Sequence, residues 1–111
     1  MRKNAIVAGI GFDGREKIIR VHCREGTKVI LKRDPTNKYD ENAIKVYLKT
    51  NVLFGLLGTK LKQIGFIKAN TAKSLAKKMD DGILLSASVD TYWAPSEKEH
   101  PRVTIEVTDE I

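Results

Sequence analysis

The alternation of apolar and polar residues predicts that most of this chain folds as short β-strands. Successive side chains of a strand point to opposite faces, so a period of two indicates a strand with one buried face. The predicted strands are Ala5–Phe12, Lys17–Cys23, Thr27–Arg33, Ala43–Leu48, Val52–Leu57, Gln63–Lys68, Ile83–Trp93 and Arg102–Val107. Lys17–Cys23 alternates only loosely and is a strand or another ordered segment. Val52–Leu57 is expected to form part of a hairpin.

One segment has helical spacing instead. Its apolar positions follow the pattern i, i+3, i+4, i+7 and are Ala72, Leu75, Ala76 and Met79. This pattern predicts a helix over about Thr71–Asp81, capped at its start by Asn70 or Thr71 and ended by Gly82 in a left-handed conformation. Several short strands with one main helix predict a small, mainly β (α+β), barrel-like fold.

Length and composition support one folded domain over residues 1–111. Apolar residues make up 41% of the chain and charged residues 31%, which provides a hydrophobic core and argues against disorder. The 20 Lys and Arg residues exceed the 14 Asp and Glu residues, giving a net charge of +6. A surplus of this kind suits a phosphate-bearing partner, although it also serves solubility alone.

Cysteine and histidine content argues against a metal site, and we expect no cofactor. Cys23 is the only cysteine, which excludes an intrachain disulfide, and the two histidines cannot complete a structural zinc site with it. In a strand, His22 and Cys23 would point to opposite faces, so they would not form a nucleophile–base pair. Cys23 is therefore expected to be a buried structural residue. With no Ser/His/Asp cluster either, we predict that the chain is not an enzyme.

The sequence also bears on cellular location. The apolar run Ala5–Ile10 is too short for the core of a secretory signal, and no segment approaches the length of a membrane span. We therefore expect a cytoplasmic protein without a membrane partner. The oligomeric state is left open.

The turn between the third and fourth predicted strands is the main candidate site. Asp34 and Asn37 can fold their side chains onto nearby backbone N–H groups, which would brace the turn. Tyr39 offers a flat face on which a nucleobase can stack. Asp40, when ionised, accepts hydrogen bonds only, so it suits a sugar hydroxyl and repels a phosphate. Asn42 can contact a ligand or brace the turn, and both interpretations stay open.

Basic and aromatic residues elsewhere extend this hypothesis. Lys73 and Lys77 are four residues apart on the predicted helix and share a face. Together with Lys68 they form either a phosphate-binding track or an ordinary solvated helix face. At the end of a later strand, alternation should turn one of Tyr92 and Trp93 inward and leave the other as a second stacking surface.

The segment Arg33–Val46, which reads RDPTNKYDENAIKV, resembles the signature of the HIRAN domain family. The segments Ala8–Ile10, Gly26–Leu31 and Gly65–Ile67 resemble further strands of that family, and the similarity spans Ala5 to Val89. The resemblance implies a modified OB-like or SH3-like antiparallel β-barrel with one main flanking helix. It also implies a role in DNA recognition, in repair or processing, as a non-catalytic module.

The resemblance further implies a pocket that captures a single-stranded 3′ end, with Tyr39 stacked on the terminal base and Asp40 accepting from the 3′-hydroxyl. The predicted nucleic-acid-binding residues are Arg33, Tyr39, Asp40, Asn42, Phe66, Lys68, Lys73, Lys77 and Trp93. The chain departs from the expected arginine, tyrosine, histidine and lysine at four positions, which are Ala5, Ile6, Phe66 and Ala69. The alternative is an accessory domain that docks on a larger helicase or nuclease.

Overall fold

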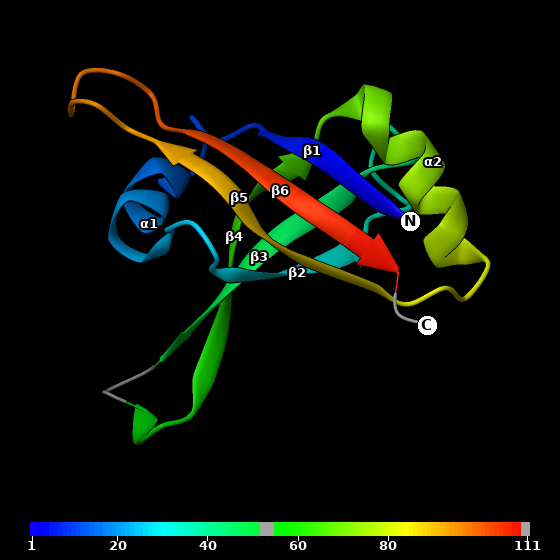
Figure 1. Cartoon of the computed structure of the whole chain (residues 1–111), viewed down its shortest axis with the longest axis horizontal. Helices are drawn as coiled ribbons and strands as arrows, with labels where there is room; N and C mark the ends of the chain where they lie inside the picture. Colours follow the sequence, from blue (N-terminus) through cyan, green and yellow to red (C-terminus); the bar gives the residue numbers. More distant parts are fainter. Residues whose placement is uncertain (52–54, 110–111) are drawn as a thin grey trace.

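The computed structural model describes residues 1–51 and 55–109. Its elements are β1 (Arg2–Ala8), α1 (Arg15–His22), β2 (Lys28–Arg33), β3 (Ile44–Asn51), β4 (Thr59–Ile67), α2 (Ala69–Asp80), β5 (Leu85–Trp93) and β6 (Arg102–Asp109). The strands close into an antiparallel barrel in the order β1-β4-β3-β2-β5-β6. The predicted mainly β barrel is confirmed. The two helices lie at opposite ends of the barrel (Figure 1).

The core fills the barrel because alternate residues of each strand point inward. On β3, Ile44, Val46 and Leu48 are buried, as the alternation predicts. The predicted apolar face of α2 is also confirmed, since Ala72, Leu75 and Ala76 are fully buried and Met79 packs against the same core. The core is therefore one continuous cluster that includes residues of both helices.

The prediction of a strand at Lys17–Cys23 is wrong, because this segment forms most of helix α1. Ile19 and Cys23 are four residues apart, so a helix places both on one face, and both are fully buried. Four is an even number, so the same two residues would also share one face of a strand, which explains the loose alternation in the sequence. His22 is exposed while Cys23 is buried, so the two still do not form a nucleophile–base pair.

Several element boundaries differ from the predicted ones. The first strand ends at Ala8, because Gly9 takes a left-handed φ of 70° and turns the chain away. Helix α2 begins at Ala69 after Lys68, with no side-chain cap, so the prediction of a cap at Asn70 or Thr71 is wrong. The end of α2 at a left-handed Gly82 is confirmed by its φ of 86°.

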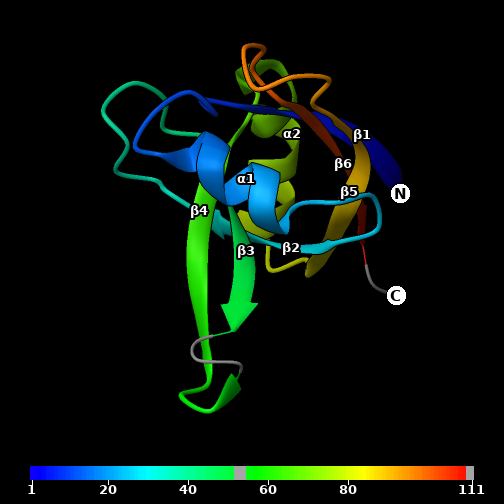
Figure 2. The same ribbon diagram turned by 90° about the vertical axis from the view of Figure 1, so that its left-hand side faces the viewer.

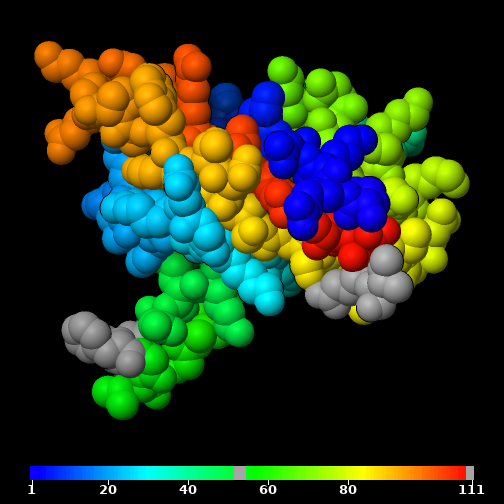
Figure 3. All heavy atoms as spheres, viewed as in Figure 1, coloured from blue at the N-terminus to red at the C-terminus, as the bar shows by residue number. Residues whose placement is uncertain are grey.

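Strands β3 and β4 extend beyond the barrel as a hairpin arm (Figures 2 and 3). Their pairing continues out to Asn51 opposite Thr59. Of the strand predicted at Val52–Leu57, residues 52–54 lie outside the described residues, whereas Leu56 and Leu57 form a turn and not a strand. The hairpin expected from this region is confirmed.

A close approach between β1 and β4 positions the candidate site. A Cβ atom on Gly65 would overlap the carbonyl oxygen of Ala8 and would lie 2.8 Å from Cγ1 of Val7. Only glycine fits at this distance, because real Cβ contacts are not so short. Gly65 thus allows Ala8 to pair with Phe66, and both of these residues line the pocket described next.

Candidate nucleic-acid-binding site

A pocket of about 240 Å³ lies where the loop between β2 and β3 meets the end of β4 and the start of α2. Its lining residues are Ala8, Asn37, Tyr39, Asp40, Ala43, Phe66, Ile67 and Ala69. Pockets for drug-sized ligands measure roughly 300–1,000 Å³, so this one suits a smaller group such as a single base or nucleoside. Its surface is mainly apolar, with two aromatic rings and the polar ends of Asn37 and Asp40.

Asn37 organises the loop that forms one side of the pocket. Its Oδ1 accepts the backbone N–H groups of Tyr39 at 2.9 Å and Asp40 at 3.1 Å. Its Nδ2 donates to Oδ2 of Asp34 at 3.0 Å. The predicted bracing is therefore confirmed for Asn37. For Asp34, the predicted bond from its side chain to a backbone N–H group is not among the hydrogen bonds of the described residues. Its carboxylate accepts from the Asn37 side chain and lies 4.0 Å from Nζ of Lys45.

One carboxylate oxygen of Asp40 accepts a hydrogen bond within the loop, and the other has no hydrogen-bond partner among the described residues. Oδ1 accepts the backbone N–H of Asn42 at 2.9 Å. Oδ2 has no hydrogen-bond donor within the described ranges 1–51 and 55–109. Asn42 itself does not line the pocket, so its observed contact is with the loop. The Asp40 carboxylate can therefore accept one hydrogen bond from a ligand without breaking the loop.

Tyr39 and Phe66 supply the aromatic surfaces of the pocket. Tyr39 is 87% exposed, and Nζ of Lys38 lies 5.5 Å from its ring centroid, within cation–π range. Phe66 is half-buried, and the guanidinium carbon of Arg15 lies 5.5 Å from the centroid of its ring. The ring of Tyr39 is largely open to solvent, so it can stack with a planar ligand.

Arg15 is a residue near the pocket that sequence reasoning missed. Its Nη1 donates to the carbonyl oxygen of Gly9 at 2.8 Å, and its Nη2 lies 3.5 Å from Oδ2 of Asp13. The chain turn after β1 is thereby held against Phe66. No sequence signal identified Arg15, because the helix that carries it was itself not predicted.

Arg33, although predicted to bind nucleic acid, makes hydrogen bonds within the protein. It donates to both carboxylate oxygens of Asp80 and to the carbonyl oxygens of Glu41 and Ala43. Its side chain is only 15% exposed. These contacts make Arg33 a clamp between the pocket loop and α2, so it does not present a free cation to a ligand.

The predicted lysines lie along α2 beside the pocket but differ in their surroundings. Lys68 precedes Ala69, which lines the pocket, and Lys73 lies five residues further along the chain within α2; both are exposed. Lys77 pairs with Asp81 at 3.6 Å. Of these three lysines, Lys68 and Lys73 have no ion pair among the described residues.

The structure does not bring Trp93 to the pocket. Its ring is 45% exposed and lies 5.2 Å from the guanidinium carbon of Arg102, its partner on β6. Tyr92 packs against the core, which confirms that one of this pair points inward. Ala5 is buried in the barrel and Ile6 is exposed outside the pocket, whereas Phe66 and Ala69 line it.

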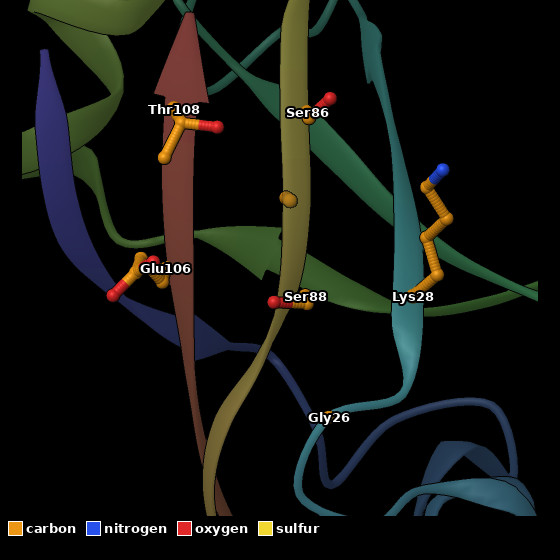
Figure 4. A pocket seen from close by; sticks show the side chains of 7 residues that line it. Gly26, Lys28, Ser86, Ser88, Glu106 and Thr108 are labelled. Carbon is orange, nitrogen blue, oxygen red and sulfur yellow. The ribbon is translucent and has the colours of Figure 1, made fainter.

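A second hollow, of about 310 Å³, lies over β2, β5 and β6 (Figure 4). Its lining residues are Gly26, Lys28, Ser86, Ala87, Ser88, Glu106 and Thr108. Its lining contains no aromatic ring, and Glu106 contributes a negative charge that would repel a phosphate. It is therefore less suited to a nucleobase than the pocket that contains Tyr39.

Within residues 1–51 and 55–109, no group of three or more His, Cys, Asp or Glu side chains could hold a metal ion. No helix in these ranges has the length and apolar character needed to span a membrane.

The fold and the pocket define a small closed β-barrel with an aromatic, loop-lined pocket at its surface. The family model described as HIRAN domain matches residues 7–110, and the chain belongs to the HIRAN family. HIRAN domains are a family of DNA-binding modules. The expected resemblance is thereby confirmed.

Two crystal structures share the fold. The HIRAN domain of human HLTF superposes with a TM-score of 0.64 at 24% identity, over 97% of this chain and 74% of that one. A protein from Lactobacillus plantarum superposes with a TM-score of 0.69 at 24% identity, over 96% and 92% of the two chains. No curated protein matches the sequence significantly.

Proposed function

We propose that this domain binds single-stranded DNA and holds its free 3′ end in the pocket between Tyr39, Asp40 and Phe66. The observation that supports this most is the uncommitted Oδ2 of Asp40 beside two aromatic rings in a pocket of about 240 Å³. A terminal base stacks on Tyr39, and Oδ2 accepts the hydrogen of the 3′-hydroxyl. The domain acts as a non-catalytic module in DNA repair or processing.

The charge of Asp40 makes the proposal selective. A 3′-phosphate would bring a second anion next to the carboxylate, which is unfavourable in a partly enclosed site. A 3′-hydroxyl is a neutral donor and satisfies Oδ2. The domain should therefore prefer a 3′-hydroxyl end to the same strand carrying a 3′-phosphate.

Fluorescence anisotropy with a 5′-labelled oligonucleotide, in 3′-hydroxyl and 3′-phosphate forms, tests this preference. Asp40→Asn keeps an oxygen for the N–H of Asn42 but replaces the ligand-facing oxygen by an NH₂ donor. This variant should bind the 3′-hydroxyl form more weakly and the 3′-phosphate form more tightly. Glu41→Gln is the matched control, because Glu41 is an adjacent exposed carboxylate outside the pocket.

Stacking is tested separately at Tyr39. Tyr39→Ala should lose about 1–3 kcal/mol of binding free energy, whereas Tyr39→Phe retains the ring and should lose little. Because Tyr39 is 87% exposed, neither variant should alter folding. Equal affinity of the wild-type protein for both 3′ forms would refute end capture, while an unchanged affinity of Tyr39→Ala would refute stacking.

A second function, docking on a larger helicase or nuclease, is favoured by one observation. Leu56 and Leu57, at the end of the β3–β4 hairpin, are 84% and 68% exposed, and exposed apolar side chains of this size suit a protein contact. A double change to serine should then abolish assembly with such an enzyme and leave the affinity for single-stranded DNA unchanged. A steep fall in affinity with salt would instead indicate direct phosphate contact.

A further inference from the structure

The outer face of β2 and β3 gathers lysines around a tyrosine. The antiparallel register places Ile30 opposite Tyr47 and Lys32 opposite Lys45, so these side chains share one face of the sheet. Lys49 follows Tyr47 by two residues and projects to the same side. We define the lysine–tyrosine face by five residues, namely Ile30, Lys32, Lys45, Tyr47 and Lys49.

The positive charge of this face is only partly compensated. Nζ of Lys45 lies 4.0 Å from Oδ2 of Asp34, which is already hydrogen-bonded to Asn37. Lys32 and Lys49 are exposed and have no carboxylate partner in the part of the chain that the structure describes. Nζ of Lys32 lies instead 5.6 Å from the ring centroid of Tyr47. Two exposed cations therefore flank an aromatic ring, a combination that suits a nucleic-acid strand.

The lysine–tyrosine face begins where the pocket ends. Lys45 pairs with Phe66 across β3 and β4, so their side chains lie next to each other on the outside of the barrel. Phe66 lines the pocket. From Lys45 the face continues along β3 to Tyr47 and Lys49, in the direction of the hairpin arm. A DNA strand that leaves the pocket beside Phe66 would therefore lie next to the ammonium group of Lys45.

We infer that the lysine–tyrosine face binds the phosphodiester backbone of the DNA strand whose 3′ end occupies the pocket. This inference rests on the proposed function. The nucleotides that precede the 3′ terminus run across Lys45, Tyr47, Lys32 and Lys49, and their phosphates contact the ammonium groups. The site therefore recognises a longer segment of single strand than the pocket alone can hold.

The test compares two variants of equal net charge. Lys32→Gln/Lys49→Gln removes two charges from the lysine–tyrosine face. Lys17→Gln/Lys98→Gln removes two charges from α1 and from the loop before β6, where both lysines are exposed and lack an ion pair among the described residues. All four positions are exposed, so both proteins should fold, which circular dichroism can verify.

Each protein is titrated with thymidine oligonucleotides of about 12 nucleotides that carry a 3′-hydroxyl or a 3′-phosphate. For the face variant we expect severalfold weaker binding of both forms and an unchanged ratio between them. The slope of log K against log salt should become shallower by about 0.7 for each lysine–phosphate pair that the substitutions remove, or about 1.4 in all. The control variant should retain the slope and most of the affinity.

The outcomes separate the two proposals. If the face variant and the control variant bind equally, with equal slopes, the lysine–tyrosine face is not the DNA path and the inference is wrong. If the wild-type protein does not distinguish a 3′-hydroxyl from a 3′-phosphate, the proposed end capture fails instead. A shallower slope confined to the face variant supports the inference.

Discussion

Arg33 and Asp80 join the pocket loop to the end of helix α2 across 47 residues of sequence. Nε of Arg33 donates to Oδ1 of Asp80 at 2.9 Å, and Nη2 donates to Oδ2 at 3.2 Å. Nη1 of the same guanidinium donates to the carbonyl oxygen of Ala43 at 2.7 Å. A bidentate arginine–carboxylate pair is among the stronger and more specific polar contacts. It therefore fixes the loop relative to the helix.

This clamp predicts a pH-dependent contribution to stability. Hydrogen bonds and charge from Arg33 lower the pKa of Asp80 from its ordinary value of 3.8. Because the folded pKa is lowered, the stabilisation is present above pH 3.8 and is lost as the pH falls through the folded pKa. Asp80→Asn should therefore lower the urea midpoint at neutral pH, and its difference from wild type should shrink in strong acid.

Asp81→Asn is the matched control for this clamp, because the one ion pair of Asp81 among residues 1–51 and 55–109 is with the exposed Lys77. It should change the midpoint less than Asp80→Asn at neutral pH. An Asp80→Asn protein as stable as wild type at neutral pH would show that the clamp does not stabilise the fold.

Asn37 should control binding through the loop and not through charge. Asn37→Ala removes the acceptor for two backbone N–H groups and the donor to Asp34. Leaving such groups unpaired costs about 1–3 kcal/mol when they are buried, and less here because the loop is partly solvated. We expect weaker DNA binding and faster hydrogen exchange at the amides of Tyr39 and Asp40. Asn42→Ala, which keeps the loop hydrogen bond of its own N–H, should leave both amides protected.

The barrel could be predicted from the sequence because alternation is a local property. Ile44, Val46 and Leu48 show it directly, and all three are buried. Helix α1 could not be predicted, because eight residues offer only two turns and Ile19 is its only fully buried residue. Tertiary packing at the barrel end, together with the left-handed Gly14 before it, fixes this helix.

The pocket was only partly predictable for a similar reason. Tyr39 and Asp40 are marked by their chemistry and by the family motif, and both line the pocket. Ala8 and Ala69 have no chemistry of their own, and they reach the pocket through the pairing of β1 with β4 and the start of α2. The use of Arg33 as a clamp depends on Asp80, and no local pattern encodes a contact over that distance.

Gly65→Ala should destabilise the fold strongly. The new Cβ would overlap the carbonyl oxygen of Ala8, which belongs to the backbone and cannot rotate away. Separating β1 from β4 should cost about 3 kcal/mol or more of unfolding free energy, at the upper end of overpacking effects. Gly11→Ala is the control, since nothing lies within 4 Å of its Cβ. If both variants unfold at the same urea concentration, the close approach does not constrain the barrel.

The thiol of Cys23 should be inert in the folded protein. Its side chain is fully buried, and burial raises the pKa of Cys23 from 9.0 to about 11, despite the opposing effect of Arg24. Because the thiolate is the reactive form, a disulfide reagent should modify Cys23 very slowly near neutral pH and rapidly after unfolding in denaturant. Rapid modification without denaturant would mean that α1 opens readily from the barrel end.

Adding a lysine at Ala69 should strengthen DNA binding. Ala69 is exposed, lines the pocket and begins α2, so a lysine there would place an ammonium group at the pocket rim. One added phosphate contact should make the slope of log K against log salt steeper by about 0.7. Ser96→Lys adds the same charge in the exposed loop before β6 and should leave the slope unchanged. If both variants gain equally, net charge and not the pocket rim governs the affinity, and phosphates do not pass beside Ala69.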